Sequence, residues 1–416
     1  MANISSGDCG FIIICAALVF LMTPALAFFY GGMVRRKNVL NTMLSSFFIC
    51  GLASVMWVII GYSLTFGGNH GGIIGDFSNI FFHNVSNAPN ATYASTIPET
   101  LFAAFQMMFA IITCALITGS LIGRMKFSSL FIFIACWSLV VYYPLAHMVW
   151  GDGGFLKELG ALDFAGGNVV HISSGVSGLV ACILLGKRRA YGMVSYKPHN
   201  IPFVVLGAGL LWFGWFGFNA GSALGANSLA VHAFLTTNTS AAAALISWMA
   251  VEWIRHGKPT MLGAATGAVV GLVAITPGAG FVPIWSALII GALVSPLCYF
   301  CMGRVKNKFG YDDALDAFGC HGVGGIFGGI VTGIFASKKV NPDIMCNGLI
   351  YGDVKLFLVQ ILSIVVTIVI AAVATFVIIK IMKVFTDIRV SELDEANGLD
   401  ISQHNESAYP SFMGLD

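Results

Sequence analysis

Two histidines in this chain each stand eight residues after an aspartate, within stretches that are otherwise apolar and rich in glycine. The first stretch is DFAGGNVVHISSGVSGLV, with Asp163 and His171, and the second is DALDAFGCHGVGGIFGGIV, with Asp313 and His321. An imidazole donates and accepts hydrogen bonds and exchanges a proton near neutral pH. An ionisable side chain in so apolar a stretch is costly to bury, so the two imidazoles are expected to face a cavity. Two unrelated buried histidines bonded to backbone carbonyls are the structural alternative.

The same two stretches indicate an internal repeat. Each histidine is followed by the spacing His-x-x-x-Gly-x-x-Gly, which places Gly175 and Gly178 in the first stretch and Gly325 and Gly328 in the second. The stretches fall in the fifth and the tenth apolar run. Because five is odd, a five-helix unit repeated once inverts its direction, which is a plan that places a transport site near the bilayer midplane. Each histidine lies about 12 Å along a helix from its aspartate, which predicts that the imidazoles meet from opposite sides.

The composition indicates a polytopic all-α membrane protein. Apolar residues make up 57 % and charged residues 10 %, and the net charge of +2 gives no indication of nucleic-acid binding. A membrane-spanning helix needs about 20 apolar residues. We expect eleven such helices, the first of them retained rather than cleaved, near 11–33, 41–67, 100–123, 127–149, 165–186, 201–223, 228–251, 260–279, 281–302, 316–336 and 354–382.

Basic residues predict the orientation of these helices. All but four of the 21 Lys and Arg residues follow odd-numbered apolar runs, and Lys and Arg concentrate on the cytoplasmic side. The four exceptions are Lys157, Lys338, Lys339 and Lys355. The amino terminus is therefore expected outside and the carboxyl terminus inside. We divide the chain into a transmembrane domain, 1–383, and a polar tail, 384–416, which taken alone has a composition compatible with disorder.

Several other residues have structural interpretations. Cys298 and Cys301 form an isolated C-x-x-C that we interpret as core residues. The sequence leaves open whether Cys9 and Cys346 form a disulfide. His147 and His232 lie near helix ends and are interpreted as structural. No cofactor, metal site or catalytic residue is expected, and the protein is not expected to be an enzyme.

A set of motifs along the whole chain resembles the ammonium transporter/methylammonium permease/Rhesus family, in its prokaryotic form. The motifs are DFAGGNVVH, GWFGFNAGSA, KPHNIP, AHMVWG and DDALDAFGCHGVGGIFGGIVTGIFA. The resemblance implies a homotrimer in the cell membrane, in which each subunit carries its own ammonium pore. It also implies that the tail supports docking of a PII-type signalling protein on the cytoplasmic face.

The resemblance assigns roles to individual residues. Twin pore histidines match His171 and His321, and a stacked phenylalanine gate matches Phe109 and Phe218. The family's outer recruitment site for ammonium matches Phe105, Phe109, Trp150 and Ser222, and the acid beside that site matches Asp163, which is interpreted as a helix cap or vestibule residue. The segment between Trp150 and Asp163 is one residue longer than the family pattern.

The residue types fit ammonium chemistry. Aromatic faces attract a small cation, and Ser222 offers an acceptor oxygen. Carrying an ion through an apolar pore costs tens of kcal/mol by idealised estimates, whereas deprotonation of an amine that titrates two to three units above pH 7 costs about 3–4 kcal/mol. We therefore expect NH4+ to lose its proton and NH3 to pass. The sequence leaves open whether the proton returns outside or crosses separately.

Other functions remain as alternatives. An ammonium receptor that signals through its tail would share the binding site but carry no flux. A membrane redox protein would use His171 and His321 as axial haem ligands and would need a large cavity between them. A CO2 channel is suggested by the Rhesus branch, although the aromatic recruitment site favours a cation.

Overall fold

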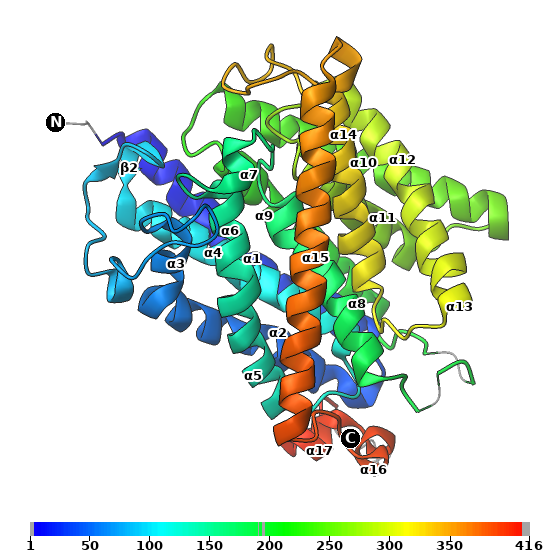
Figure 1. The fold of residues 1–416 in the computed structure, drawn as a ribbon. Coiled ribbons are helices and arrows are strands. Elements are labelled where there is room, and N and C mark those ends of the chain that lie inside the picture. The colour runs from blue at the N-terminus through cyan, green and yellow to red at the C-terminus, as the bar shows by residue number, and fades with distance from the viewer. Residues whose placement is uncertain (1–3, 190, 194–195, 410–416) are drawn as a thin grey trace.

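The computed structural model describes residues 4–189, 191–193 and 196–409, and these residues form a helical bundle (Figure 1). Ten helical segments of this part are long and apolar enough to cross a membrane, which confirms the predicted polytopic all-α class. The helices as far as residue 185 are α1 (Ser6–Met33), α2 (Val39–Met56), α3 (Tyr62–Phe66), α4 (Glu99–Leu121), α5 (Phe127–Trp137), α6 (Tyr143–Trp150), α7 (Phe155–Glu158) and α8 (Ser173–Leu185). The later helices are α9 (Ile201–Gly221), α10 (Ser228–His256), α11 (Met261–Ile275), α12 (Ile284–Phe300), α13 (Lys306–Phe309), α14 (Val323–Phe335), α15 (Val354–Phe385), α16 (Glu392–Asn397) and α17 (Leu399–His404).

Helix α11 is shorter than the span predicted at 260–279. It has 15 residues, or about 22 Å at 1.5 Å per residue, which is less than the apolar thickness of a bilayer. Pro277 follows the helix end, and a proline cannot continue the hydrogen-bond ladder. The buried turn after Ile275 instead packs against Gly167, before α8, and against Gly328 in α14, because a Cβ at either glycine would contact the Pro277 ring.

Polar side chains cap the helices at their amino-terminal ends. Ser5, Asn200, Asn227 and Thr260 each accept a hydrogen bond from a backbone N–H in the first turn of the helix that follows. Such a bond satisfies a donor that has no partner within the helix and contributes about 1 kcal/mol. These local signals fix where the apolar runs begin as helices.

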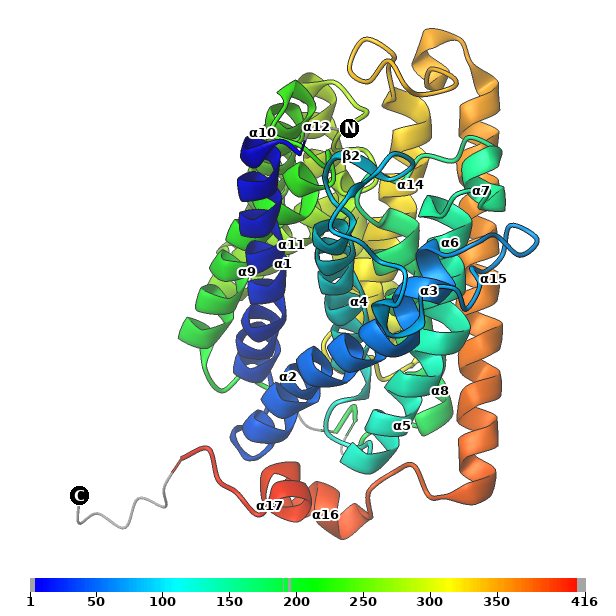
Figure 2. The same cartoon turned by 90° about the vertical axis from the view of Figure 1, so that its left-hand side faces the viewer.

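The long connection between α3 and α4 covers one end of the bundle. It contains a short antiparallel pair, β1 (Pro89–Asn90) and β2 (Ala94–Pro98), in which Asn90 pairs with Ala94. Helix α7 and the connection after α14 lie at the same upper end in Figure 1, whereas α16 and α17 lie at the lower end (Figures 1 and 2). The beginning of α1 therefore lies at the end of the bundle opposite to α16 and α17.

The tail is packed rather than disordered over the residues that the structure describes. The backbone of Lys126 donates to Ile388 O, and Val390 donates to Arg124 O, at 3.0 Å each. Asp400 is buried and accepts from the backbone N–H of Asn41 at 2.8 Å, in the first turn of α2. Residues 410–416, the end of the predicted tail, lie outside the described residues.

A buried ionic cluster joins three connections at the lower end of the bundle. Arg188 donates to both carboxylate oxygens of Asp312, at 2.9 and 2.6 Å, and the fully buried Arg124 lies 3.7 Å from the same carboxylate. Burial works to raise the pKa of Asp312, but the hydrogen bonds and charges of the two arginines hold it below its ordinary value. The cluster therefore stays ionised at neutral pH. It links the connection after α8 to Asp312, which directly precedes Asp313.

The ten cysteines all belong to the described part of the chain, and no disulfide forms among them there. All ten are free, including Cys9 and Cys346, so the pairing left open from the sequence does not form here. Cys298 is buried within α12 and Cys301 is half-buried.

Candidate functional site

The two histidines lie at matching positions in two irregular helical segments. His171 belongs to η5 (Gly167–Ile172) and His321 to η7 (Phe318–Gly322), and both segments are π-helical. They lead into α8 and α14, which have 13 residues each and run in opposite directions (Figure 1). The imidazole rings lie nearly parallel, with centroids 5.4 Å apart and an interplanar angle of 16°. The sequence repeat therefore corresponds to two antiparallel units whose histidines face each other.

Each unit begins at its aspartate, which caps the histidine segment. The Asp163 carboxylate accepts from the backbone N–H groups of Gly166, Gly167, Asn168 and Val169. The Asp313 carboxylate accepts from Ala317 and Phe318, at 3.2 and 2.8 Å. A carboxylate at a helix amino terminus satisfies free donors and is favoured by the helix dipole. The eight-residue spacing thus places each imidazole about two helical turns beyond the aspartate that caps its segment.

Asp163 also holds an aromatic ring in place. Its backbone oxygen accepts from Trp150 Nε1 at 2.9 Å. Burial raises the pKa of the Asp163 carboxyl to about 6, although the four N–H groups act to lower it. The carboxylate is therefore still mainly ionised at neutral pH.

Glycines allow the two histidine units to touch. A Cβ on Gly175 would lie 2.6 Å from Gly322 Cα and would overlap its backbone nitrogen, and a Cβ on Gly325 would lie 3.1 Å from His171 Cβ. Small residues permit such backbone approach between helices in membranes. The repeated His-x-x-x-Gly spacing therefore sets the distance between the imidazoles.

The imidazoles line a small and almost wholly apolar cavity. It has a volume of about 10 Å³, and its walls include Leu26, Val170, Trp215 and Phe218 as well as both histidines. Both ring nitrogens of His171 and Nδ1 of His321 are buried and have no hydrogen-bond partner among the described residues. Such a volume holds about one water-sized molecule. This arrangement contradicts the alternative of a carbonyl-bonded His171, and a haem has no room between the rings.

A stacked pair of phenylalanines closes the cavity on its upper side. The Phe109 and Phe218 rings have centroids 4.3 Å apart at 28°. Phe109 also lines a pocket of about 220 Å³, here called the upper pocket, together with Tyr93, Phe102, Trp150 and Ser222. Phe105 does not line this pocket, because its ring is buried against Gly221 behind Phe109. Of the four residues expected at the recruitment site, Phe109, Trp150 and Ser222 line this pocket and Phe105 does not.

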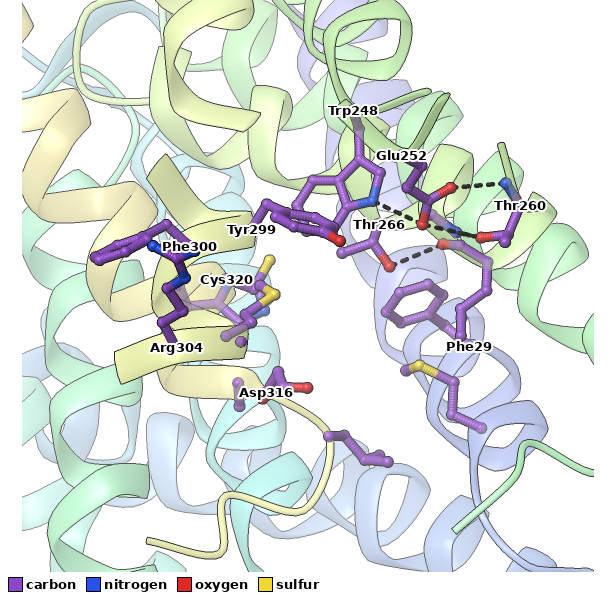
Figure 3. Close-up of a pocket in the computed structure, with 18 of the residues that line it drawn as sticks. Phe29, Trp248, Glu252, Thr260, Thr266, Tyr299, Phe300, Arg304, Asp316 and Cys320 are labelled. Carbon is purple, nitrogen blue, oxygen red and sulfur yellow. Dashed lines mark hydrogen bonds between the residues drawn. The ribbon is translucent and has the colours of Figure 1, made fainter. Parts of the chain in front are cut away.

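A third cavity also has His321 in its wall, and Figure 3 shows other residues that line it. This lower pocket has a volume of about 450 Å³, and its walls include Phe29, Trp248, Tyr299 and Cys320. Glu252 forms part of the wall, and its carboxylate accepts from Thr260 N at 2.6 Å and from Thr260 Oγ1 at 3.0 Å. Each of these sites shares a residue with the next one. Phe109 belongs to the upper pocket and the phenylalanine pair, Phe218 to the pair and the histidine cavity, and His321 to that cavity and the lower pocket. We call this row of cavities the path, and the phenylalanine pair separates its upper pocket from the histidine cavity.

Some residues on this path were not predicted. Trp215 stacks on His171, with centroids 5.4 Å apart at 20°, and its position three residues before Phe218 on one helix face was a usable signal. Tyr93 reaches the upper pocket from the connection before α4 and has no such signal in the sequence. His147 has both ring nitrogens bonded, to Thr65 O and Asn69 Oδ1, and lies off the path.

Comparison with known proteins identifies the family. The model of the Ammonium Transporter Family matches residues 10–409. The chain belongs to this family. An ammonium transporter of Bacillus subtilis is 51 % identical over 407 residues, which cover 98 % of this chain and 99 % of the relative. The relatives named are transporters rather than enzymes, and the family resemblance drawn from the sequence motifs is confirmed.

Solved structures of the family share this fold. The crystal structure of Saccharomyces cerevisiae Mep2 matches with a TM-score of 0.88 and 36 % identity, covering 94 % of this chain and 88 % of that one. A structure described as a sensor Amt protein matches with a TM-score of 0.88 and 28 % identity, covering 96 % and 98 % of the two chains. The family fold is therefore that of a multi-pass membrane protein.

Proposed function

We propose that this protein takes up ammonium by binding NH4+ in the upper pocket, removing its proton and passing NH3 through the twin-histidine cavity. The observation that carries the proposal is the small cavity between Phe218 and His321, with unpartnered imidazole nitrogens in apolar walls. One neutral, water-sized molecule such as NH3 fits it, whereas a hydrated ion does not. The proton either returns to the upper side or crosses separately.

The upper pocket has the chemistry of a recruitment site for a small cation. The faces of Trp150, Phe109 and Tyr93 attract positive charge. The Ser222 hydroxyl donates to Phe218 O at 2.9 Å, which leaves its oxygen lone pairs available to accept from NH4+. A potassium ion would meet the same rings but would gain less from this directional acceptor.

The orientation, membrane and assembly belong to the same proposal. With the amino terminus outside, the upper pocket faces the exterior of the cell membrane and the tail lies in the cytoplasm. We further propose a homotrimer in which residues 1–383 form the transporting domain. The tail, 384–416, would then offer a docking element for a PII-type protein, since its contacts with Asn41 and Lys126 place it across the lower face.

A receptor for ammonium is the second candidate, because one similar structure is described as a sensor Amt protein. Transport separates the two functions. Purified protein in liposomes on a solid-supported membrane should give a transient current after an ammonium jump and none after a matched potassium jump. A rise in lumenal pH without current would indicate NH3 conduction alone. Absence of both signals from a folded protein that binds ammonium would favour the receptor.

Replacing Trp150 by alanine should raise the ammonium concentration at half-maximal current about 2- to 30-fold, with little change in the maximal current. The loss of one cation–π contact, at about 0.5–2 kcal/mol, gives this range. Trp285→Ala is the matched control, because Trp285 is exposed at the start of α12 and packs on Phe335. An unchanged concentration dependence in Trp150→Ala would remove this ring from the recruitment site.

A further inference from the structure

A lysine forms part of the wall of the upper pocket. Lys157 is the only charged side chain among the described residues that line it. Its Nζ lies 3.4 Å from the backbone oxygen of Trp150 and 5.8 Å from the centroid of the Tyr93 ring. No Asp or Glu oxygen in the described part of the chain lies within ion-pair distance of it. The pocket therefore contains a positive charge without an ion-pair partner where a cation would bind.

The backbone of Lys157 is fixed, whereas its side chain is free to move. Helix α7 is held by the fully buried Leu156 and by a bond of 3.0 Å from Phe155 N to Gly72 O. The lysine is half-buried, and its ammonium group sits on a flexible four-carbon stem. The 3.4 Å contact is long for a hydrogen bond, so little holds the ammonium group at one point. It can approach or leave the aromatic rings without any change in the backbone.

The contacts of Lys157 Nζ are of the kind that an ammonium ion would make. A lysine ammonium carries three N–H donors, and here it meets a carbonyl oxygen and an aromatic face. The group and a bound NH4+ would therefore use the same acceptors and would repel each other. Their repulsion is strongest when both occupy the pocket, and it acts over a few ångströms in partly dehydrated surroundings.

We propose that Lys157 is a built-in competitor of the transported cation, which raises the ammonium concentration needed to fill the upper pocket. This inference rests on the proposed recruitment of NH4+ at that pocket. It makes Lys157 a residue that sets the apparent affinity for ammonium. A neutral side chain of the same length should then bind ammonium more tightly.

The test compares Lys157→Met with Lys157→Arg, which keeps the charge, and with Lys339→Met as a matched control. Lys339 is exposed in the connection after α14, at the same upper end (Figure 1), and does not line the pocket. Lys157→Met should lower the half-saturating ammonium concentration about three- to tenfold, as expected for removing a charge a few ångströms away. The difference in half-saturating ammonium concentration between Lys157→Met and wild type should shrink at high ionic strength, because salt screens the partly exposed charge.

Two readouts keep this proposal separate from the proposed transport. Current in liposomes reports flux, and the rise in unfolding temperature with ammonium chloride, relative to potassium chloride, reports binding without flux. A wild-type protein with neither a current nor a rise in lumenal pH would remove the transport function, while the binding measurement would still test Lys157. Equal ammonium dependence of Lys157→Met and wild type in both readouts overturns the inference. A shift of the same size in Lys339→Met would also overturn it, since a general surface charge would then account for the effect.

Discussion

Ammonium flux should fall about ten- to hundredfold when His171 or His321 is replaced by leucine. The substitution keeps the cavity filled but removes the nitrogens that would bond a passing NH3, and an unpaired polar group in apolar surroundings costs about 1–3 kcal/mol. Replacement by alanine should act differently. It enlarges a cavity of about 10 Å³, admits water and ions, and should produce a current with potassium as well as with ammonium.

The measurement is the ammonium and potassium current of each variant in liposomes, with the amount of folded protein matched by chromatography. His232→Leu is the control, because His232 lies in α10, bonds Val282 O through Nε2 at 2.8 Å, and lines none of the three cavities. If both leucine variants kept the flux and selectivity of the wild type, the twin-histidine mechanism would be wrong.

Replacing Gly175 by alanine should lower both stability and flux, although alanine favours an isolated helix by about 0.8–1 kcal/mol. The new Cβ would meet the backbone of Gly322, which cannot move aside as a flexible side chain can. Overpacking of this kind costs about 1–3 kcal/mol. The two histidine units would be forced apart, and the imidazoles would lose their shared position in the cavity.

Thermal unfolding in detergent and ammonium current would measure the two effects. Gly209→Ala serves as the control, because Gly209 lies within α9 and has nothing within 4 Å of an added Cβ. This variant should be as stable as the wild type or slightly more so. A Gly175→Ala protein with the stability and flux of Gly209→Ala would contradict the role assigned to this helix crossing.

Much of the fold could be read from local features of the sequence. Apolar runs of about 20 residues predict the spanning helices, and ten segments of that kind are present among the described residues. The aspartates at 163 and 313 were recognisable as starts of equivalent helices, because a capping carboxylate acts within a few residues of its own position. The pairing of His171 with His321 followed from the repeat, since two inverted copies of one unit place equivalent residues opposite each other.

The tertiary structure decided the features that depend on contacts between distant segments. Tyr93 and Lys157 come to the upper pocket from connections whose composition gives no sign of it, and Phe105, expected there, is buried behind Phe109. Asp400 meets the first turn of α2 from the other end of the chain. Hydropathy and capping act along one segment and are visible in its residues. The walls of a pocket depend on how many segments pack together, and no single segment carries that information.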